Sequence, residues 1–389
     1  MLSKRIQTLS PSLTIAIATL ARELKAEGKD IISFSAGEPD FDTPIAVKDA
    51  AKKALDAGQT KYTAVPGTPE LLQAVADKLQ RENGLTYAPN QIQTNNGAKH
   101  SLFNLFQALI DEGDEVIIPA PYWVTYPELV KYASGVPVII DTDDSSGFKI
   151  TASQLKSAIT PKTKVLILTS PSNPTGAVYT KAELEALAEV LKGTEVLVVS
   201  DEMYEKLVFD GTEFVATASI SDDMFQRTIT VNGLSKSAAM TGWRFGYMAS
   251  AHTELIAAMN KLQSQSTSNI NSITQKAAIT GLDGTIDKKV EEMRVAFEAR
   301  CAEATKLFNA VDRLSVVKPS GAFYLFVNIK EVSNDSMQFC KDLLEDQGVA
   351  VVPGVGFGAE GYFRFSYATD IETIKKGISR IETFVNKQK

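Results

Sequence analysis

Short apolar runs alternate with amphipathic helical segments from Asp42 to about Leu262, and this alternation strongly limits the folds open to the chain. Runs such as Val165–Leu168 and Val196–Val199 are continuous, which is typical of strands buried on both faces of a sheet. The predicted strands are Glu115–Pro119, Val136–Asp141, Lys164–Ser170, Glu195–Ser200, Thr228–Asn232 and Arg244–Ser250. The predicted helices between them include Ser101–Leu109, Tyr122–Ala133, Lys181–Leu191 and Thr253–Leu262. We therefore expect an α/β fold with a large, mainly parallel sheet flanked by helices.

The C-terminal part of the chain shows a different pattern. A long helical stretch, Lys288–Ala310, precedes a strand that alternates, Ala322–Asn328. The elements expected after it are a helix at Ser336–Gln347, strands at Val349–Val352 and Tyr362–Tyr367, and a closing helix from Ile371. This pattern predicts a smaller α+β domain. We expect residues 46–285 to form the large domain, residues 286–389 the C-terminal small domain, and residues 1–45 an N-terminal segment that contributes to the small domain.

The N-terminal segment Met1–Ala21 allows two interpretations. Lys4 and Arg5 precede the apolar stretch Leu13–Ala21, as in a signal peptide. The favoured interpretation is an amphipathic helix of the mature chain, with an apolar stripe formed by Ile17, Leu20, Ala21 and Leu24. No apolar run approaches the roughly 18 residues needed to span a bilayer, so no membrane association is expected.

The composition narrows the chemistry open to the chain. It has two His and two Cys, and 40 basic against 47 acidic residues give a net charge of −7. So few, widely separated His and Cys cannot form a zinc site, and the mild negative charge argues against a nucleic-acid surface. Two distant thiols suggest a reducing, cytoplasmic location. We therefore expect no metal, and chemistry that rests on carboxylates, Lys, Tyr and Arg or on a cofactor.

Residues that could bind a ligand follow the predicted strands. They are the polar or charged residues Asn173, Asp201, Tyr204 and Lys236, and Gly97, whose position at a helix start exposes backbone N–H groups. In open α/β sheets ligands bind outside the carboxyl ends of the strands, so these residues are expected to meet at one edge of the sheet.

Such a set of groups suits pyridoxal 5′-phosphate. A Lys amine forms a Schiff base with an aldehyde, and a buried Asp keeps a pyridine nitrogen protonated. Tyr and Asn side chains can hydrogen-bond the ring oxygen, and a glycine at a helix start exposes N–H groups to a phosphate. Taken singly, Lys236 could be a solvated turn residue, Asp201 a helix cap, and Asn173–Gly176 a plain turn. Their shared position after strands favours the cofactor site.

The most specific sequence pattern surrounds Lys236. Gly233-Leu234-Ser235-Lys236 is followed by Ala-Met-Thr-Gly-Trp-Arg-Phe-Gly at 239–246. Shorter matching segments are Ala36–Pro44, Asn173–Gly176, Ser200–Tyr204 and Arg364–Ala368. From about Ser12 onward the chain resembles the class I and II aminotransferases of fold type I, and within them the prokaryotic-type aspartate aminotransferases. The resemblance implies transfer of the amino group of L-aspartate to 2-oxoglutarate, giving oxaloacetate and L-glutamate.

The resemblance also implies roles at the cofactor ring. Lys236 would bind the cofactor as a Schiff base and carry the proton between the substrate Cα and the cofactor. Asp201 would pair with the pyridinium nitrogen, and Asn173 and Tyr204 would bond the 3-oxygen. Trp123 would stack on the ring, although a core aromatic in the predicted helix remains its alternative.

At the phosphate, the resemblance implies binding by the backbone amides of Gly97, Ala98 and Lys99 together with Arg244. Tyr62 resembles the tyrosine that reaches the phosphate of the neighbouring subunit. A homodimer with active sites at its interface is therefore implied.

The resemblance assigns the substrate α-carboxylate to Arg364, helped by Asn173 and the Gly37 backbone. Its alternative is a wet strand face, because Arg364 alternates with the aromatic residues of Tyr362–Tyr367.

The resemblance implies that Lys99, with Thr14 nearby, binds the second carboxylate of aspartate. The alternative is that Lys99 is a solvated residue in the first turn of its helix. The substrate remains open in part. An aminotransferase for aromatic amino acids, prephenate or alanine, or a β-lyase on the same scaffold, would need the same cofactor residues.

Two other classes of protein are disfavoured. Gly354–Ala359 matches a dinucleotide-binding pattern, but a predicted strand follows where that motif requires a helix. A cofactor-sensing transcription regulator would need a basic DNA-binding module, and no such region precedes the fold in this sequence.

Four positions leave questions open. Gly233 stands where the wider family often has a phosphate-binding Ser, and Ser235 beside it is not assigned a role. Phe245 stands where a smaller aliphatic residue is usual. His100 lies beside the expected phosphate loop.

Overall fold

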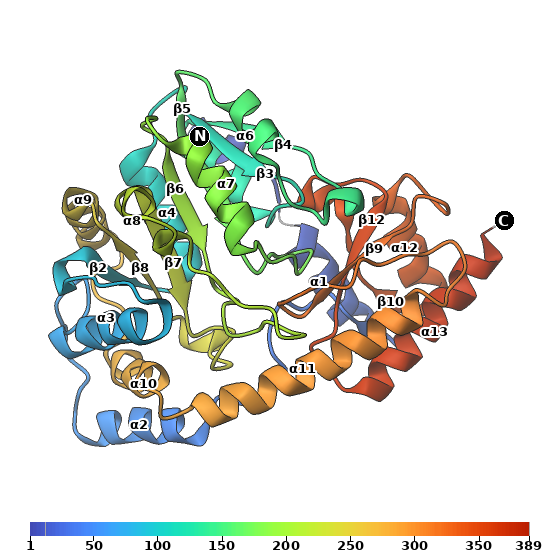
Figure 1. Cartoon of the computed structure of the whole chain (residues 1–389). Helices are drawn as coiled ribbons and strands as arrows, with labels where there is room; N and C mark the ends of the chain where they lie inside the picture. The colour runs from blue at the N-terminus through green and yellow to red at the C-terminus, as the bar shows by residue number, and fades with distance from the viewer. Residues whose placement is uncertain (12, 389) are drawn as a thin grey trace.

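The computed structural model describes residues 1–11 and 13–388, without the side chains of Thr14 and Ile15. Its largest sheet has seven strands in the order β2-β8-β7-β6-β5-β3-β4 (Figure 1). They are β2 (Ile92–Asn95), β3 (Glu115–Pro119), β4 (Val136–Ile140), β5 (Thr163–Thr169), β6 (Leu197–Asp201), β7 (Thr228–Gly233) and β8 (Gly246–Ser250). Strands β3 to β7 pair in parallel, and β8 runs antiparallel to both of its neighbours. The large, mainly parallel sheet is confirmed.

The continuous apolar run in β5 is explained by burial on both faces. Val165 and Ile167 pack toward one side of the sheet, and Leu166 and Leu168 pack toward the other. The first side is covered by α4 (Ala98–Leu109), α5 (Thr125–Tyr132) and α9 (Thr253–Ser264). The second side is covered by α6 (Ala152–Ala158), α7 (Lys181–Leu191) and α8 (Asp222–Arg227). Each such buried side chain contributes roughly 1.5–3 kcal/mol to folding.

Three helices pack at the end of the sheet formed by β2 and β8. They are α2 (Ile45–Asp56), α3 (Pro69–Asn83) and α10 (Ser272–Leu282). Local sequence sets the ends of α3. The Thr68 hydroxyl accepts a hydrogen bond from the Leu71 N–H at 3.3 Å, and Pro69 occupies the first helical position. Gly84 ends the helix with φ +68°, a left-handed conformation that costs glycine little.

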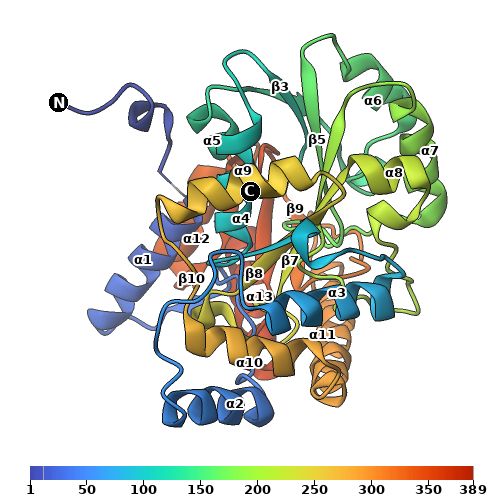
Figure 2. The same ribbon diagram turned by 90° about the vertical axis from the view of Figure 1, so that its left-hand side faces the viewer.

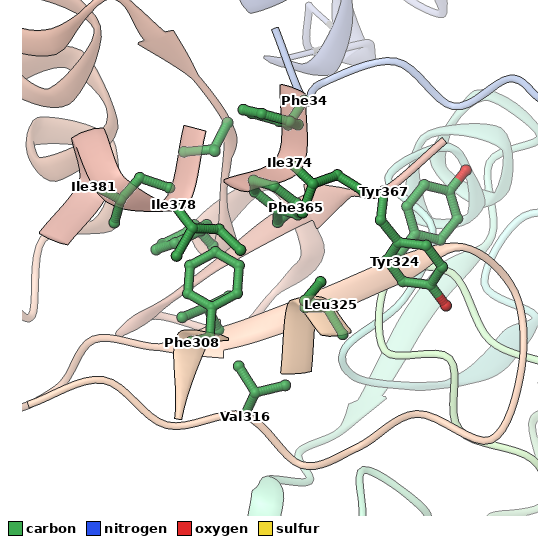
Figure 3. Packing of buried hydrophobic residues seen from close by; sticks show 14 of the residues in the cluster. Phe34, Phe308, Val316, Tyr324, Leu325, Phe365, Tyr367, Ile374, Ile378 and Ile381 are labelled. Atoms are coloured by element: carbon green, nitrogen blue, oxygen red, sulfur yellow. The ribbon is translucent and has the colours of Figure 1, made fainter. Parts of the chain in front are cut away.

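A second sheet, called the small sheet below, has the antiparallel order β11-β12-β9. Its strands are β9 (Tyr324–Asn328), β11 (Val352–Pro353) and β12 (Tyr362–Ser366), and the helices around it are α11 (Asp287–Phe308), α12 (Ser336–Gln347) and α13 (Ile371–Lys387). Figure 3 shows its core, in which Phe34 from the N-terminal segment stacks on Phe365 with ring centroids 4.1 Å apart. Tyr324 and Tyr367 lie together at one edge of this core.

The N-terminal segment joins the small sheet's part of the molecule. Strand β1 (Ile32–Ser33) pairs in parallel with β10 (Val349–Ala350). Helix α1 (Leu13–Ala26) lies beside α12 (Figure 2), and its Ile17, Ala21 and Leu24 pack against Leu344 and Ala350. The predicted helix is therefore confirmed, but Leu20 of the predicted stripe is 42% exposed. Among the described residues, no helix combines the length and apolarity needed to cross a bilayer.

Most predicted elements differ by one to three residues at their ends, and three of the differences have a visible structural reason. The helix expected at Tyr122–Ala133 begins only at Thr125, because the Tyr122 N–H is bonded to the Phe357 carbonyl at 3.0 Å. The strand expected from Arg244 begins at Gly246, since Arg244 has a left-handed φ of +59°. The expected strand Val349–Val352 divides into β10 and β11, which belong to different sheets.

The glycine-rich segment that matched a dinucleotide pattern is a loop between two strands. Gly354–Phe357 forms a short 3-10 turn between β11 and β12. A Cβ on Gly354 would lie 2.2 Å from the Ala359 carbonyl oxygen. Glycine at this position allows the loop to pack closely on itself. The loop between two strands that the sequence predicted is confirmed.

Candidate active site

A cavity of about 720 Å³ lies where the carboxyl ends of β5, β6 and β7 face the small sheet and the N-terminal segment. Ten of the predicted site residues line it: Gly37, Ala98, Lys99, Trp123, Asn173, Asp201, Tyr204, Lys236, Arg244 and Arg364. These residues are spread over more than 300 positions of the chain, and the fold brings them to one place. Cavities of this size are typical of cofactor and substrate sites.

Lys236 lies in the loop after β7, with its ammonium inside the cavity. Its Nζ donates a hydrogen bond to the Gly37 carbonyl oxygen. Burial lowers the pKa of Lys236 to about 8, and the nearby Arg364 cation acts in the same direction. A much larger share of this amine is therefore unprotonated near neutral pH than of an exposed lysine, as a nucleophile requires.

Asp201 ends β6, and its side chain is buried. Its Oδ2 accepts a hydrogen bond from the Tyr126 hydroxyl at 2.7 Å, and its Oδ1 accepts one from the Met203 N–H at 3.3 Å. Burial raises the pKa of Asp201, while these two hydrogen bonds and Lys236 oppose that rise. The carboxylate is thus held in place and can share a proton with a basic ring nitrogen.

Tyr126 was not predicted as a site residue. It lies on α5, its hydroxyl is also 2.8 Å from the Thr169 hydroxyl, and its ring meets Trp123 edge-on at 5.4 Å. From the sequence it is one more aromatic residue on an amphipathic helix. Only the packing of α5 over the ends of β5 and β6 reveals its contact with Asp201.

Asn173 and Tyr204 are both buried in the cavity wall. The Asn173 Oδ1 accepts a hydrogen bond from Arg364 Nη1 at 2.9 Å, and the Tyr204 hydroxyl lies 2.8 Å from the hydroxyl of Tyr324. Burial raises the pKa of Tyr204 well above its usual value, so this phenol stays protonated and can donate. Tyr324, on β9, is a second cavity residue that sequence analysis missed.

Arg364, on β12, is only 2% exposed, so the expectation that its strand face could simply be wet is wrong. The small sheet places Arg364 against the cavity, and the alternate residues of β12 pack in the core. Besides Asn173, Arg364 donates through Nη2 to the Ser35 carbonyl at 2.8 Å, and its Nε has no partner among the described residues. Burial lowers the pKa of the guanidinium. A buried cation bonded only to neutral oxygens suits an anionic ligand.

The start of α4 forms an anion cradle. Gly97 caps the helix with φ +82°, and a Cβ there would lie 2.6 Å from Arg244 Nη2. Arg244 is held in turn by the carbonyl oxygens of Thr241 at 2.9 Å and Asn96 at 3.2 Å. The Gly97 N–H donates to the Asn95 carbonyl at 2.7 Å, whereas the N–H groups of Ala98 and Lys99 have no backbone partner among the described residues. These two N–H groups and the Arg244 guanidinium together suit a phosphate ester.

The structure explains two of the four open positions, Gly233 and His100. A Cβ on Gly233 would lie 2.7 Å from the Phe245 carbonyl oxygen, so close packing of β7 on β8 requires glycine there. Ser235 lines the cavity. The Nδ1 of His100 accepts a hydrogen bond from the Asn96 N–H at 3.2 Å, which stabilises the turn before α4.

Trp123 lies in the loop between β3 and α5 rather than in a helix, so the core-helix alternative for it is wrong. The Lys99 ammonium lies 4.8 Å from the centre of the Trp123 ring. Lys99 as a whole is exposed, but partial burial of its ammonium, with repulsion from Arg244, lowers its pKa. Lys99 is therefore a further cation of the cavity, in addition to Arg364 and to Lys236, Arg244 and Arg22, which also line it.

Three predicted site residues are not among the described residues that line this cavity, and one of them, Gly97, lies in the cradle at the start of α4. Tyr62 is 90% exposed in the loop between α2 and α3 and is absent from the cavity lining. The side chain of Thr14 lies outside the described residues.

The residues present fit pyridoxal 5′-phosphate. The Gly97–Arg244 cradle, the buried Asp201 and the low-pKa Lys236 match the phosphate, the ring nitrogen and the aldehyde of this cofactor in turn. The Arg364 Nε, which has no partner among the described residues, is left for a substrate carboxylate. Within the described part of the chain, no group of three or more His, Cys, Asp or Glu side chains gathers as a metal site would require.

Comparisons with known proteins agree with this geometry. The chain matches the family model described as aminotransferase class I and II over residues 29–381. It is 49% identical to the aspartate aminotransferase of Bacillus sp. (strain YM-2), with 99% of each chain covered. It is 48% identical to an aspartate/prephenate aminotransferase of Cereibacter sphaeroides, with 98% of each covered.

The solved structure of Thermus thermophilus aspartate aminotransferase with maleate is 44% identical to the chain and has a TM-score of 0.95, with 98% of this chain and 99% of that chain covered. Taken together with the site, these matches establish that the chain belongs to the class I and II aminotransferases, which are pyridoxal 5′-phosphate enzymes.

Proposed function

We propose that the enzyme transfers the amino group of L-aspartate to 2-oxoglutarate and so produces oxaloacetate and L-glutamate. The observation that carries this proposal is that Arg364 and Lys99 are among the cations that line the cavity, apart from Lys236 and the expected phosphate ligand Arg244. A dicarboxylic amino acid needs one cation for each carboxylate. The maleate named for the Thermus thermophilus relative is itself a dicarboxylate.

Each cavity residue has a defined task at the cofactor. Lys236 would bind the cofactor aldehyde and then move the proton to and from the substrate Cα. Asp201 would hold the proton on the ring nitrogen, and Tyr204 and Asn173 would bond the 3-oxygen. Trp123 would cover one face of the ring. The bound cofactor supplies a ring that accepts the electron pair left at Cα.

The phosphate would lie on the N–H groups of Gly97, Ala98 and Lys99, beside Arg244. Tyr62 would reach the phosphate of a second copy of the chain, so we propose a homodimer with shared active sites. The 90% exposure of its side chain supports this, since Tyr62 has little to pack against in its own chain.

In the substrate subsite, Arg364 and Asn173 would bind the α-carboxylate together with the backbone of Gly37. Lys99 would bind the distal carboxylate, with Thr14 beside it. Prephenate is a second candidate substrate, because the Cereibacter sphaeroides relative carries it in its name.

We also propose the division of the chain that the sequence predicts, with a large domain at 46–285 and a small domain at 286–389 that residues 1–45 complete. The pairing of β1 with β10 supports the last point. The two buried, unpaired thiols, Cys301 and Cys340, support a cytoplasmic location.

The substrate is tested by mixing the holoenzyme with aspartate or with alanine and following the absorbance change of the cofactor. Aspartate should react faster, and faster reaction with alanine would refute the dicarboxylate proposal. Lys99→Ala should raise KM for aspartate by about 10-fold or more, since a charge-assisted hydrogen bond is lost, and leave KM for alanine unchanged. Lys156→Ala, on the exposed side of α6, serves as the control.

The cofactor attachment is tested by borohydride reduction of the holoenzyme, followed by peptide mapping. The label should be found on Lys236, and a label on another lysine would contradict the site. Lys236→Ala should lower kcat by roughly 10⁴-fold or more, because both the attachment and the proton transfer depend on this amine.

A further inference from the structure

Tyr324 on β9 contacts three residues that the proposed reaction uses. Its hydroxyl lies 2.8 Å from the Tyr204 hydroxyl, and its ring centre lies 4.4 Å from the Arg364 guanidinium carbon. A Cβ on Gly37 would lie 3.0 Å from the same hydroxyl, so Tyr324 also touches the segment whose carbonyl accepts from Lys236. The side chain is fully buried and lines the cavity.

The small sheet fixes this position. In the β12–β9 register, Arg364 faces Phe326 and Ser366 faces Tyr324, so Tyr324 and Arg364 are diagonal neighbours on one face. The opposite face carries Leu325 and Phe365, which pack in the core shown in Figure 3. Strand pairing therefore fixes the spacing between the backbones that carry the Arg364 cation and the Tyr324 phenol.

The direction of the phenol pair follows from counting protons. Each hydroxyl has one proton to donate. If Tyr204 donates its proton to the cofactor 3-oxygen, the pair can form only when Tyr324 donates to the Tyr204 oxygen. Such a chain strengthens the second donor, because each hydrogen bond polarises the next. The Arg364 cation over the Tyr324 ring favours the same direction, since it draws electrons from that phenol.

We propose that Tyr324 is a positioning residue that orients the Tyr204 hydroxyl toward the cofactor and links it to the carboxylate site at Arg364. The proposal rests on the proposed function, because it requires a bound pyridoxal phosphate. Carboxylate binding at Arg364 would offset the cation that polarises Tyr324, and Tyr204 would then become a weaker donor.

The test uses the colour of the holoenzyme, which changes with pH as the proton beside the Lys236 nitrogen dissociates. Once that proton has left, the negative 3-oxygen depends more strongly on the Tyr204 donor. Tyr324→Phe should therefore move the midpoint of the colour change upward by about 0.5 pH unit, the effect of weakening one hydrogen bond. Tyr204→Phe should move it further.

The double variant separates positioning from a general structural effect. In the Tyr204→Phe background, Tyr324→Phe should cause no further shift, because it acts through Tyr204. An equal shift in both backgrounds, or no shift in either, would overturn the proposal. Maleate, which has no amino group to transfer, should raise the midpoint of the wild type more than that of Tyr324→Phe, and equal increases would count against the link to Arg364.

Tyr367→Phe is the matched control. It removes a buried hydroxyl that donates to the Ala322 carbonyl at 3.3 Å, from a neighbouring ring in the same core (Figure 3). Its midpoint should equal that of the wild type. A wild type without any pH-dependent colour would refute the proposed function itself, whereas a normal wild type with an unshifted Tyr324→Phe would refute only the role of Tyr324.

Discussion

Two buried cations of this enzyme are satisfied in opposite ways. Lys78, on α3, is 4% exposed and is bonded to the Glu205 carboxylate, with Glu82 Oε2 at 3.3 Å and Asn83 Oδ1 at 2.9 Å. Arg364 is 2% exposed, and among the described residues its hydrogen bonds go only to an amide oxygen and a backbone carbonyl.

The pKa values of the two groups follow this difference. Burial would lower the pKa of Lys78, but the neighbouring carboxylates, Glu205 foremost, raise it above its usual value. Burial lowers the pKa of Arg364, and no carboxylate contact compensates for it. Removing a paired buried cation leaves its carboxylate partners buried without compensation and so destabilises the fold, whereas a cation with a free donor is prepared for a ligand.

Replacing Arg364 should give the largest effect, and on activity alone. Arg364→Met should lower kcat/KM for every amino donor by about 10³-fold, because two charge-assisted hydrogen bonds to the α-carboxylate are lost. Its free energy of unfolding should change by no more than about 1 kcal/mol, since an uncompensated buried charge is removed. Steady-state kinetics and urea denaturation measure the two quantities. A loss of stability as large as the loss of activity would show that Arg364 is a structural cation.

Replacing Lys78 should give the reverse result. Lys78→Met leaves Glu205 buried without its cation and should lower the free energy of unfolding by about 3–5 kcal/mol. The folded holoenzyme should keep kcat/KM within about 3-fold of the wild type, as expected for a change outside the substrate site. The exposed pair Lys52–Asp49 provides the control, because Lys52→Met should cost at most about 1 kcal/mol. Equal stability of the two variants would contradict the structural role of Lys78.

Glu202 sharpens the comparison, because it is a buried carboxyl close to the Lys78 cluster. Burial, with repulsion from Glu205, raises the pKa of Glu202 to about 8, and its Oε2 has no partner among the described residues. The folded chain therefore keeps this proton where the unfolded chain has lost it. The stability that results is complete below the unfolded pKa near 4.5 and is lost as pH rises through about 8.

Glu202→Gln should remove this dependence. From pH 5 to pH 8 the wild type should lose on the order of 3 kcal/mol more unfolding free energy than the variant does. Urea denaturation at the two pH values measures the difference. Parallel pH profiles would mean that Glu202 is ionised in the folded enzyme.

The large sheet, and the site residues that follow its strands, could be predicted from the sequence because both depend on short segments of the chain. The apolar run of β5 requires burial on both faces whatever surrounds it. In parallel strands, the residues that follow each strand lie at one edge of the sheet, so Asp201, Tyr204 and Lys236 were expected together. The comparisons confirm the family, the enzyme class and the cofactor that these residues indicated.

The rest of the site depended on contacts between distant segments. Tyr126 and Tyr324 are aromatic residues at positions that suit a core, and nothing local shows that their hydroxyls reach Asp201 and Tyr204. The period of β12 places Arg364 opposite the core face, but it cannot show whether water or another part of the protein covers that side.

The sequence by itself thus determined the sheet, the ends of helices with local caps such as α3, and the identity of the reactive groups, because these follow from residue type and short-range periodicity. Only the tertiary structure decided which charges are paired, which phenols are linked and which cation is left free. Pairing and desolvation depend on which distant segments meet, and that information is carried by the fold as a whole.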